Sequence, residues 1–292
     1  MATDSFPPIR SLEPGDLKRC VALSVDRGWS PERSKWSLLL AASEAFGVDA
    51  PVGRGQAGAV VLTRWGADLA SVGMMLVAAR YGRCGLGRAL MEHVIAEAGG
   101  ATLTLFATDM GRPLYEKLGF QPVRRNVSFA GAFRTARPGA SPAAGPAGWV
   151  RAATEADLPA MLALDREAFG ADRGRILTRL PGFADRIAVL ADHSEHRLSG
   201  YAAAWRNTPS STVIGPLVAP DAPSAERLVT DLAARAHGTV RLDLDPDRPE
   251  LPAWAHRHGL EPVSRTLVMA HGELTDRGAP DRLFAPISVA LA

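Results

Sequence analysis

The sequence predicts a mixed α/β protein built from two similar domains, and three observations support this fold class. An apolar strand pattern at residues 74–79 leads through a basic, glycine-rich turn into a helix pattern. Short sequence matches recur along the chain at an offset of 140 or 141 residues. A stretch rich in alanine, proline and glycine lies between the two copies, and such composition is typical of a linker. We therefore expect two tandem α/β domains.

The internal repeat rests on three pairs of matching segments. These are Ile9-Arg10 with Val150-Arg151, Leu76-Val77-Ala78 with Leu217-Val218-Ala219, and Gly119-Phe120 with Gly259-Leu260. Matches at nearly one offset indicate a duplicated unit. We expect an N-terminal domain at residues 1–130, a linker at 131–148 and a C-terminal domain at 149–292.

The first half of the N-terminal copy is predicted to hold a strand, two helices and a strand pair. The strand covers residues 9–12, and an amphipathic helix at 16–26 follows Pro14-Gly15. A second helix is expected at 34–46, because Pro31 and Glu32 suit its first turn. Strands at 59–65 and 68–79 turn at Gly66.

The second half of this copy alternates helix and strand. A helix at 86–98 ends at Gly99-Gly100, and a β-prone run covers 102–108. A short helix at 111–118 has Pro113 in its first turn and Gly119 after its end. A last strand is expected at 122–129. The residues alone support only a mixed α/β assignment.

Composition excludes several classes of protein. The 292 residues include 47% hydrophobic and 22% charged residues, which is ample for a buried core. The net charge of +2 and the lack of a basic stripe argue against a nucleic-acid partner. No apolar run approaches the ~18 residues of a membrane span. Two distant cysteines without a signal peptide predict a reducing, cytoplasmic location.

The turn at residues 81–87 has the composition of an anion-binding loop. Its glycines let the backbone approach a ligand closely, and the helix start offers unpaired N–H groups with partial positive charge. Arg83 and Arg88 add full charges. A nucleotide-hydrolase loop would need Lys then Ser or Thr where Arg88 and Ala89 stand, and a dinucleotide loop would need a third glycine at Leu90. We expect the ligand to be a pyrophosphate.

This loop resembles the acyl-CoA signature of the GNAT N-acyltransferase superfamily, which reads Gln/Arg-x-x-Gly-x-Gly/Ala. In that register Gly82 takes the Gln/Arg place, with Arg83 beside it, and the glycines are Gly85 and Gly87. A second element of the superfamily carries a Tyr five residues before the Phe of Gly-Phe. Tyr115 and Phe120 have this spacing. The resemblance identifies the chain as a tandem GNAT protein.

The resemblance implies a fold, a co-substrate and a set of site residues. Each domain would be a mostly antiparallel sheet, splayed at the acyl-CoA site and flanked by helices. Acetyl-CoA would be the co-substrate, with no metal, and Tyr115 would give a proton to the departing sulfur. The residues expected to bind acetyl-CoA are Met75, Leu76, Val77, Gly82, Arg83, Cys84, Gly85, Leu86, Gly87, Arg88, Thr108 and Gly111.

The acceptor is expected to be an amine of a small molecule. Trp29, Trp36 and Glu32 lie in the helical region that walls the acceptor site in this superfamily. An alkyl ammonium with a pKa near ~10.4 must lose a proton before it attacks, so a base is expected. The candidate carboxylates are Asp26, Glu32, Glu44 and Asp109.

The second copy is predicted to be degenerate. Its loop is acidic and lacks glycine, with Asp221 and Glu226 where positive charge is expected, so it would repel a pyrophosphate. Ala255 stands at the position of Tyr115. The alternative is a different ligand, held by His256, His258, Trp205 and Trp254.

Two functions remain open at this stage. The first is an acyl-CoA-dependent N-acyltransferase acting by direct attack in a ternary complex. The second is a non-catalytic protein that binds and senses acyl-CoA or another ligand. The chain is expected to be a monomer or homodimer, and its apolar closing segment at 283–292 to add a strand to a neighbouring domain or subunit.

Overall fold

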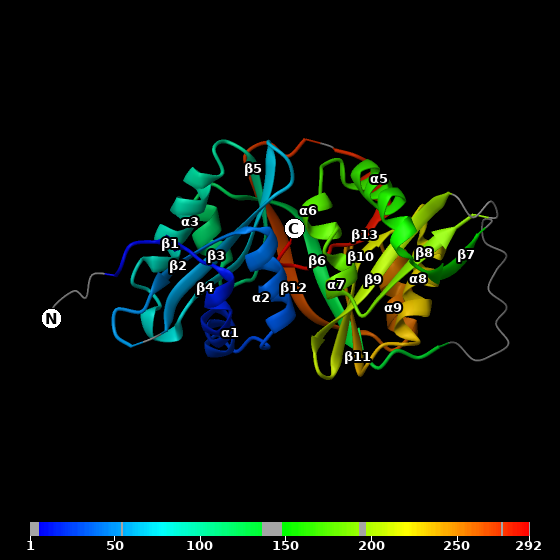
Figure 1. Cartoon of the computed structure of the whole chain (residues 1–292), viewed down its shortest axis with the longest axis horizontal. Helices are drawn as coiled ribbons and strands as arrows, with labels where there is room; N and C mark the ends of the chain where they lie inside the picture. Colours follow the sequence, from blue (N-terminus) through cyan, green and yellow to red (C-terminus); the bar gives the residue numbers. More distant parts are fainter. Residues whose placement is uncertain (1–5, 54, 136–147, 193–196, 276, 292) are drawn as a thin grey trace. The chain divides into compact units, whose positions relative to one another are not determined.

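The computed structural model describes residues 6–53, 55–135, 148–192, 197–275 and 277–291. The chain divides into two compact units (Figure 1). Unit 1 consists of Met1–Pro122, Met269–Leu274 and Ala290–Ala292, and unit 2 of Val123–Val268 and Thr275–Val289. Each unit therefore contains segments from both halves of the sequence. Most of the linker predicted at 131–148 lies outside the described residues.

Unit 1 is built on a twisted sheet with the strand order β1-β2-β3-β4-β5. Neighbouring strands are antiparallel, except that β4 and β5 are parallel. A parallel pair needs a crossover, which α3 provides. The strands are β1 (Arg10–Ser11), β2 (Glu44–Asp49), β3 (Gln56–Arg64), β4 (Leu69–Val77) and β5 (Thr102–Ala107).

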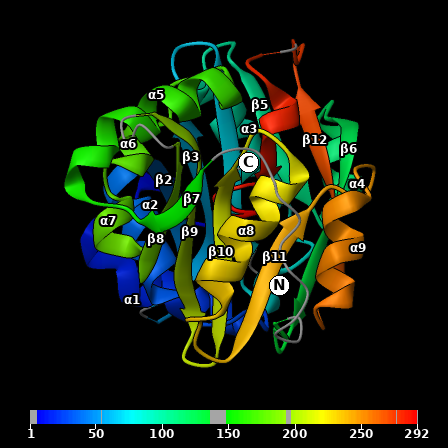
Figure 2. The same ribbon diagram turned by 90° about the vertical axis from the view of Figure 1, so that its right-hand side faces the viewer.

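Helices cover both faces of this sheet. The views of Figures 1 and 2 show α1 and α2 on one face and α3 and α4 on the other. Leu86 and Leu90 of α3 pack against Gly58 of β3, where a side chain would collide with Leu90. The helices are α1 (Leu17–Asp26), α2 (Arg33–Ala42), α3 (Leu86–Glu97) and α4 (Arg112–Lys117).

One predicted element of unit 1 is wrong at its end. The helix expected at 34–46 stops at Ala42, and residues 44–49 form β2 instead. Ser43 is extended, and Phe46 and Val48 are buried between β1 and β3. Aromatic and β-branched residues favour strands, and pairing on both sides here overrides the helical pattern.

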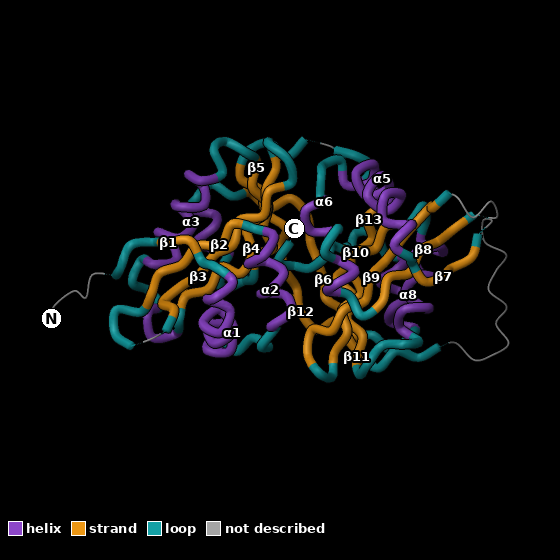
Figure 3. Tube along the Cα trace, in the orientation of Figure 1, coloured by secondary structure: helices purple, strands orange, loops and turns teal. Residues whose placement is uncertain are grey.

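Unit 2 repeats the same arrangement, with helices shown in purple around strands in orange in Figure 3. Its strand order is β6-β11-β10-β9-β8-β7, and the one parallel pair here is β10 with β11. The strands are β6 (Gln121–Gly131), β7 (Trp149–Ala152), β8 (Arg186–Ala191), β9 (Leu198–Thr208), β10 (Ser211–Val218) and β11 (Thr239–Leu244).

The helices of unit 2 also lie on both faces of its sheet, with α8 seen in front of β10 in Figure 2. They are α5 (Leu158–Phe169), α6 (Gly174–Leu177), α7 (Leu180–Phe183), α8 (Ala222–Ala233) and α9 (Glu250–Arg257). No helix in the described part of the chain is both long and apolar enough to cross a membrane.

Two late strands complete the fold. In unit 2, β6 runs antiparallel to β11, and its Asn126 donates a hydrogen bond of 3.2 Å to Thr266 of β12 (Glu261–His271). The end of β12 belongs to unit 1, where Thr102 donates to the carbonyl of Glu273 at 2.8 Å.

The closing segment does form a strand, β13 (Leu283–Ala285), and it pairs with β10 of its own half of the sequence.

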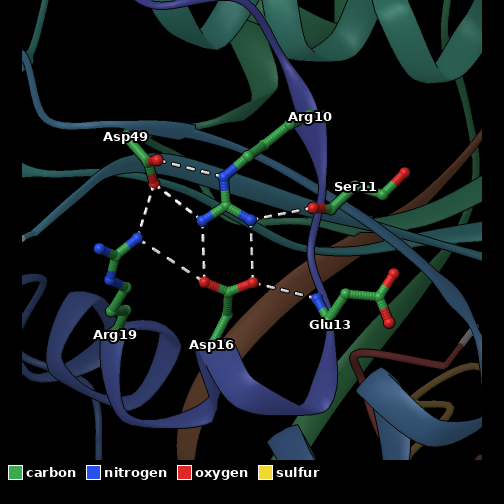
Figure 4. A network of polar contacts seen from close by, with 6 residues as sticks. All are labelled: Arg10, Ser11, Glu13, Asp16, Arg19 and Asp49. Carbon is green, nitrogen blue, oxygen red and sulfur yellow. Dashed lines mark hydrogen bonds and ion pairs between the residues drawn. The ribbon is translucent and has the colours of Figure 1, made fainter.

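The start of each unit is fixed by the same arginine–aspartate pair, separated by one repeat length. Arg10 donates hydrogen bonds of 2.9 and 2.8 Å to Asp16, and Arg151 donates bonds of 2.7 and 2.8 Å to Asp157. Figure 4 shows that Asp49 and Arg19 extend the first pair into a network. The hydrogen bonds from arginine lower the pKa of both Asp16 and Asp157.

These pairs predict acid-sensitive stability. A carboxyl whose pKa is lower in the folded state stabilises the protein above its unfolded pKa of ~3.9, and this contribution is lost as the pH falls through the folded-state value. The free energy of unfolding by urea should therefore fall below about pH 4. Asp157→Asn should lower it by about 1–2 kcal/mol at pH 7 and flatten the acid limb.

Asp185→Asn is the control, because it removes an exposed ion pair with Arg206. It should change the free energy of unfolding by less than about 0.5 kcal/mol. Equal losses in the two variants would contradict the assigned role of Asp157.

Candidate functional site

The site begins where β4 leaves β5. The two strands pair from Leu69 to Val72, and the last pair is Val72 with Leu105. On its other side β4 has one extra residue, because Val61 pairs with Gly73 but Ala59 pairs with Leu76. Such a β-bulge bends a strand. Met74, within the bulge, has a φ of 48°, a conformation that costs a non-glycine residue about 1–3 kcal/mol and is frequent at functional sites.

The loop after β4 presents backbone donors. Gly85 caps α3 with a φ of 80°, and in the described part of the chain no side chain accepts a hydrogen bond from the N–H groups at this helix start. A Cβ on Gly85 would meet nothing within 4 Å. Within the described residues, no hydrogen bond is recorded from the backbone N–H groups of residues 83–88. Residues 82–85 are exposed, so the loop fits an anion at a helix N-terminus.

Two arginines add positive charge to the loop. Arg83 is exposed and has no ion pair among the described residues, whereas Arg88 pairs with Glu92 at 2.9 Å. The Cys84 thiol is exposed and lies 3.6 Å from the carbonyl oxygen of Gly82. Arg80, before the loop, lies over the Tyr81 ring at 4.6 Å.

The two predicted acyl-CoA elements meet at Gly87. A Cβ at this position would lie 3.0 Å from the Met75 Cε and 3.6 Å from a Val77 methyl, both on β4. It would also lie 3.5 Å from a Leu114 methyl on α4. The start of α3, the end of β4 and α4 therefore converge at Gly87, where a Cβ would be tight against the flexible end of Met75. Leu76 and Leu86 are buried beside it.

Tyr115 lies on α4 and is 8% exposed. Its ring packs 6.0 Å from that of Phe120. Its hydroxyl would be 3.3 Å from a Cβ on Gly111, whose N–H donates to the Thr108 hydroxyl at 3.2 Å. Burial raises the pKa of Tyr115 to about 12. The phenol is therefore neutral at physiological pH.

The three residues predicted to bind the acceptor lie in different environments. Trp29 is 41% exposed. Trp36 is fully buried and donates from its indole to the Ser24 hydroxyl at 2.8 Å. Glu32 is buried in an ion pair with Lys35. Trp29 is the one of the three that reaches the surface.

The candidate bases are also separated by the structure. Glu44 forms an ion pair with Arg64 at 2.8 Å. Asp109 is exposed. The sulfur of its neighbour Met110 lies 3.5 Å from the guanidinium of Arg27, which follows the last residue of α1. Asp26 accepts a hydrogen bond of 2.6 Å from the N–H of Ala79, just beyond β4. This link joins α1 to the site strand, and no sequence pattern signals it. Among the described residues, no group of three or more metal-ligating side chains is found.

The four residues named for an alternative ligand in the second copy each contact other side chains of the protein. Trp205 is buried against Phe183, with 5.0 Å between the rings. His258, Trp254 and Phe133 form a cluster of three rings in mutual contact, and the His258 Nδ1 lies 2.8 Å from the Trp254 carbonyl. His256 instead faces Glu261 at 3.0 Å.

The parted strands, the bulge and the glycine loop at a helix start define a class of α/β fold with an exposed, uncapped helix start beside β4. A model of the acetyltransferase (GNAT) domain matches residues 37–122, and a second model with the same description matches residues 161–285. Together they cover more than half of the chain. The protein belongs to the GNAT superfamily and carries two GNAT domains in tandem.

Similar proteins agree with this assignment. The chain is 31% identical over 187 residues to YitH, an uncharacterised N-acetyltransferase of Bacillus subtilis, and spans 63% of its length. A candidate acetyltransferase of Pyrococcus horikoshii has a TM-score of 0.80 at 18% identity, with 98% of this chain and 95% of that chain covered. A tandem GNAT protein from the clavulanic acid biosynthesis pathway has a TM-score of 0.64 at 17% identity, with 92% and 99% covered. At these identities the two structures show a shared fold alone.

Proposed function

We propose that the protein transfers an acetyl group from acetyl-CoA to an amine of a small molecule, by direct attack in a ternary complex, with the chemistry in unit 1. The observation that carries this proposal is the convergence of β4, α3 and α4 at Gly87. Two separate sequence signatures meet there, beside a loop with unused backbone donors. Membership in the GNAT superfamily supports acyl transfer as the class of reaction.

The loop would hold the pyrophosphate of the co-substrate. The N–H groups of residues 83–88 would donate to it, supported by the helix dipole and by the Arg83 charge. The backbone of Met75–Val77 would bind the pantetheine and the thioester carbonyl, where a fixed N–H donor stabilises the oxyanion that develops. Thr108 and Gly111 would border the thiol end. Acetyl-CoA itself supplies the activated acyl group.

Tyr115 would act mainly as a hydrogen-bond donor. A phenol with a pKa of about 12 is a weaker acid than a thiol of pKa ~8.5. Outright proton transfer to the leaving thiolate would therefore be uphill by roughly 4–5 kcal/mol. A hydrogen bond that strengthens as negative charge develops on sulfur still lowers the barrier. The effect of removing it should accordingly be moderate.

Asp26 is our choice for the general base. Glu32 and Glu44 are both engaged in ion pairs. Asp26 is exposed and is held by the Ala79 N–H at the end of the strand that would bind the thioester. A carboxylate fixed in this way is suited to accept a proton from an ammonium, directly or through one water molecule. Trp29 would pack against the body of the acceptor.

The binding step predicts that Gly85→Glu abolishes acetyl-CoA binding in a calorimetric titration. A carboxylate in the loop would repel the diphosphate and fill the space beside the N–H groups. Gly66→Glu is a matched control, because Gly66 also has a positive φ and open space around its Cβ position. Unchanged heat in Gly85→Glu, or loss of binding in both variants, would rule out the loop as the diphosphate site.

The role of Tyr115 predicts that Tyr115→Phe lowers kcat by about 10–1,000-fold. Release of free thiol should be measured against a panel of amines, with acetyl-CoA affinity measured in parallel. That affinity should be nearly unchanged. Because the pKa of Tyr115 is about 12, the wild-type rate should show no loss from phenol ionisation below about pH 11. Binding of acetyl-CoA without turnover on any amine would instead favour the sensing function.

The role of Asp26 as a base predicts that one substitution, Asp26→Asn, lowers activity without lowering stability. Asp26→Asn keeps an acceptor for the Ala79 N–H but cannot take a proton, so kcat should fall at least about 100-fold with little change in thermal stability. The rate should recover as the pH is raised toward the pKa of the amine. An Asp26→Asn enzyme with normal kcat at neutral pH would exclude Asp26 as the base.

A further inference from the structure

The edge of β10 in unit 2 is occupied by the chain itself. Strand β10 pairs with β11 from Ser211 to Val213 and then leaves it, as β4 leaves β5 after Val72. Beyond this point β13 runs antiparallel to β10, with Leu217 opposite Ala285 and Val218 opposite Leu283. The N–H of Ala219 then donates to the carbonyl of Arg282 at 3.0 Å.

Strand β13 pairs with the part of unit 2 that corresponds, in the repeat, to the end of β4 in unit 1. Leu217-Val218 is the counterpart of Leu76-Val77 at an offset of 141 residues. In unit 1 these are residues whose backbone we propose to bind the acyl-CoA arm. In unit 2 the corresponding backbone is paired with a strand of protein. An extended pantetheine and an extended peptide offer similar amide groups to a strand edge.

Side chains hold β13 in place. Arg248 donates to the carbonyls of Pro280, Asp281 and Leu283 at 3.3, 2.5 and 2.9 Å, and its guanidinium lies 4.3 Å from the Phe284 ring. Arg282 binds Glu167 at 2.8 Å and the Ser199 carbonyl at 3.1 Å. Phe284 and Ala285 are buried. Hydrogen bonds with a charged partner are stronger than those between neutral groups, so the segment is firmly attached.

One further feature of unit 2 disfavours a phosphate. A side chain on Gly215 would collide with the Pro286 carbonyl, so glycine permits the close approach of the chain here, but Gly73 of β4 does the same for the Ala290 carbonyl in unit 1 and this contact does not distinguish the units. The start of α8 already has an anion, because the Asp221 carboxylate accepts a hydrogen bond of 2.8 Å from the Ser224 N–H. A diphosphate there would face this negative charge.

We infer that unit 2 has become a binding site for an extended polypeptide, that its occupant is residues 280–285 of this chain, and that the protein takes up one acyl-CoA per chain. The stoichiometry rests on the proposed function of unit 1, whereas the exclusion of acyl-CoA from unit 2 does not. In the second GNAT domain the free edge of β10 thus still binds an extended chain, but this chain is β13 and acyl-CoA cannot bind there.

Hydrogen–deuterium exchange of the full chain, with and without acetyl-CoA, tests this inference. Peptides that cover 215–219 and 281–286 should exchange slowly in the free protein and should not change on addition of acetyl-CoA. Peptides that cover 82–89 should gain protection. Added protection at 215–228, or immediate exchange of 217–219 in the free protein, would overturn the inference. Absence of protection at 82–89 alone would reject the proposed function and leave this inference standing.

A variant tests the attachment of β13. Arg248→Ala should speed exchange at 217–219 by at least about tenfold, because several hydrogen bonds to the segment are lost. Arg248→Lys should have a smaller effect. Arg235→Ala is the matched control, because the Arg235 side chain is exposed and bonds only to Asp231 of α8, four residues earlier, in the described part of the chain. Unchanged exchange in Arg248→Ala, with circular dichroism showing an intact fold, would contradict the role of Arg248 in holding β13.

Discussion

The parting of two parallel strands is the constraint on which both units depend. Once β4 leaves β5, and β10 leaves β11, one edge of each strand has backbone groups that need partners other than the next strand. Buried N–H and C=O groups are almost always paired, so such an edge requires an occupant. The two units differ in what that occupant is. In unit 2 it is β13, and in unit 1 we propose that it is the arm of acetyl-CoA.

The residues at the two helix starts explain why the same fold takes a protein strand in unit 2 and, as we propose, acetyl-CoA in unit 1. Unit 1 has a loop of glycines and arginines before α3, and its first N–H groups are not capped by a side chain. Unit 2 caps α8 with Asp221. One helix start therefore attracts an anion and the other already satisfies its own donors. The chemistry that we propose for unit 1 depends on this uncapped helix start, which costs the helix a little stability.

Much of the fold could be predicted from the sequence, because the repeat, the glycine loop and the apolar strands are local patterns. The strand–loop–helix at residues 74–97 and the short helix before Phe120 are found in the structure. Strand β2 was missed because its residues continue a helical pattern, and pairing with β1 and β3 decides its conformation. The burial of Trp36, the ion pair of Glu32 and the bond from Ala79 to Asp26 depend on residues far apart in the chain. No spacing rule connects such residues, so the sequence could not indicate which of the candidate carboxylates and tryptophans would face the acceptor.

The late segments of the chain have an evolutionary consequence. Residues 269–274 belong to unit 1, while residues 123–131 belong to unit 2. After a duplication, such an exchange makes each copy dependent on the other for its completion. Deleting the second half of the sequence would therefore leave unit 1 without residues 269–274 of its own architecture. A split in the middle of the chain would leave each unit incomplete, so the second copy is needed for the fold of the first whatever reaction it performs.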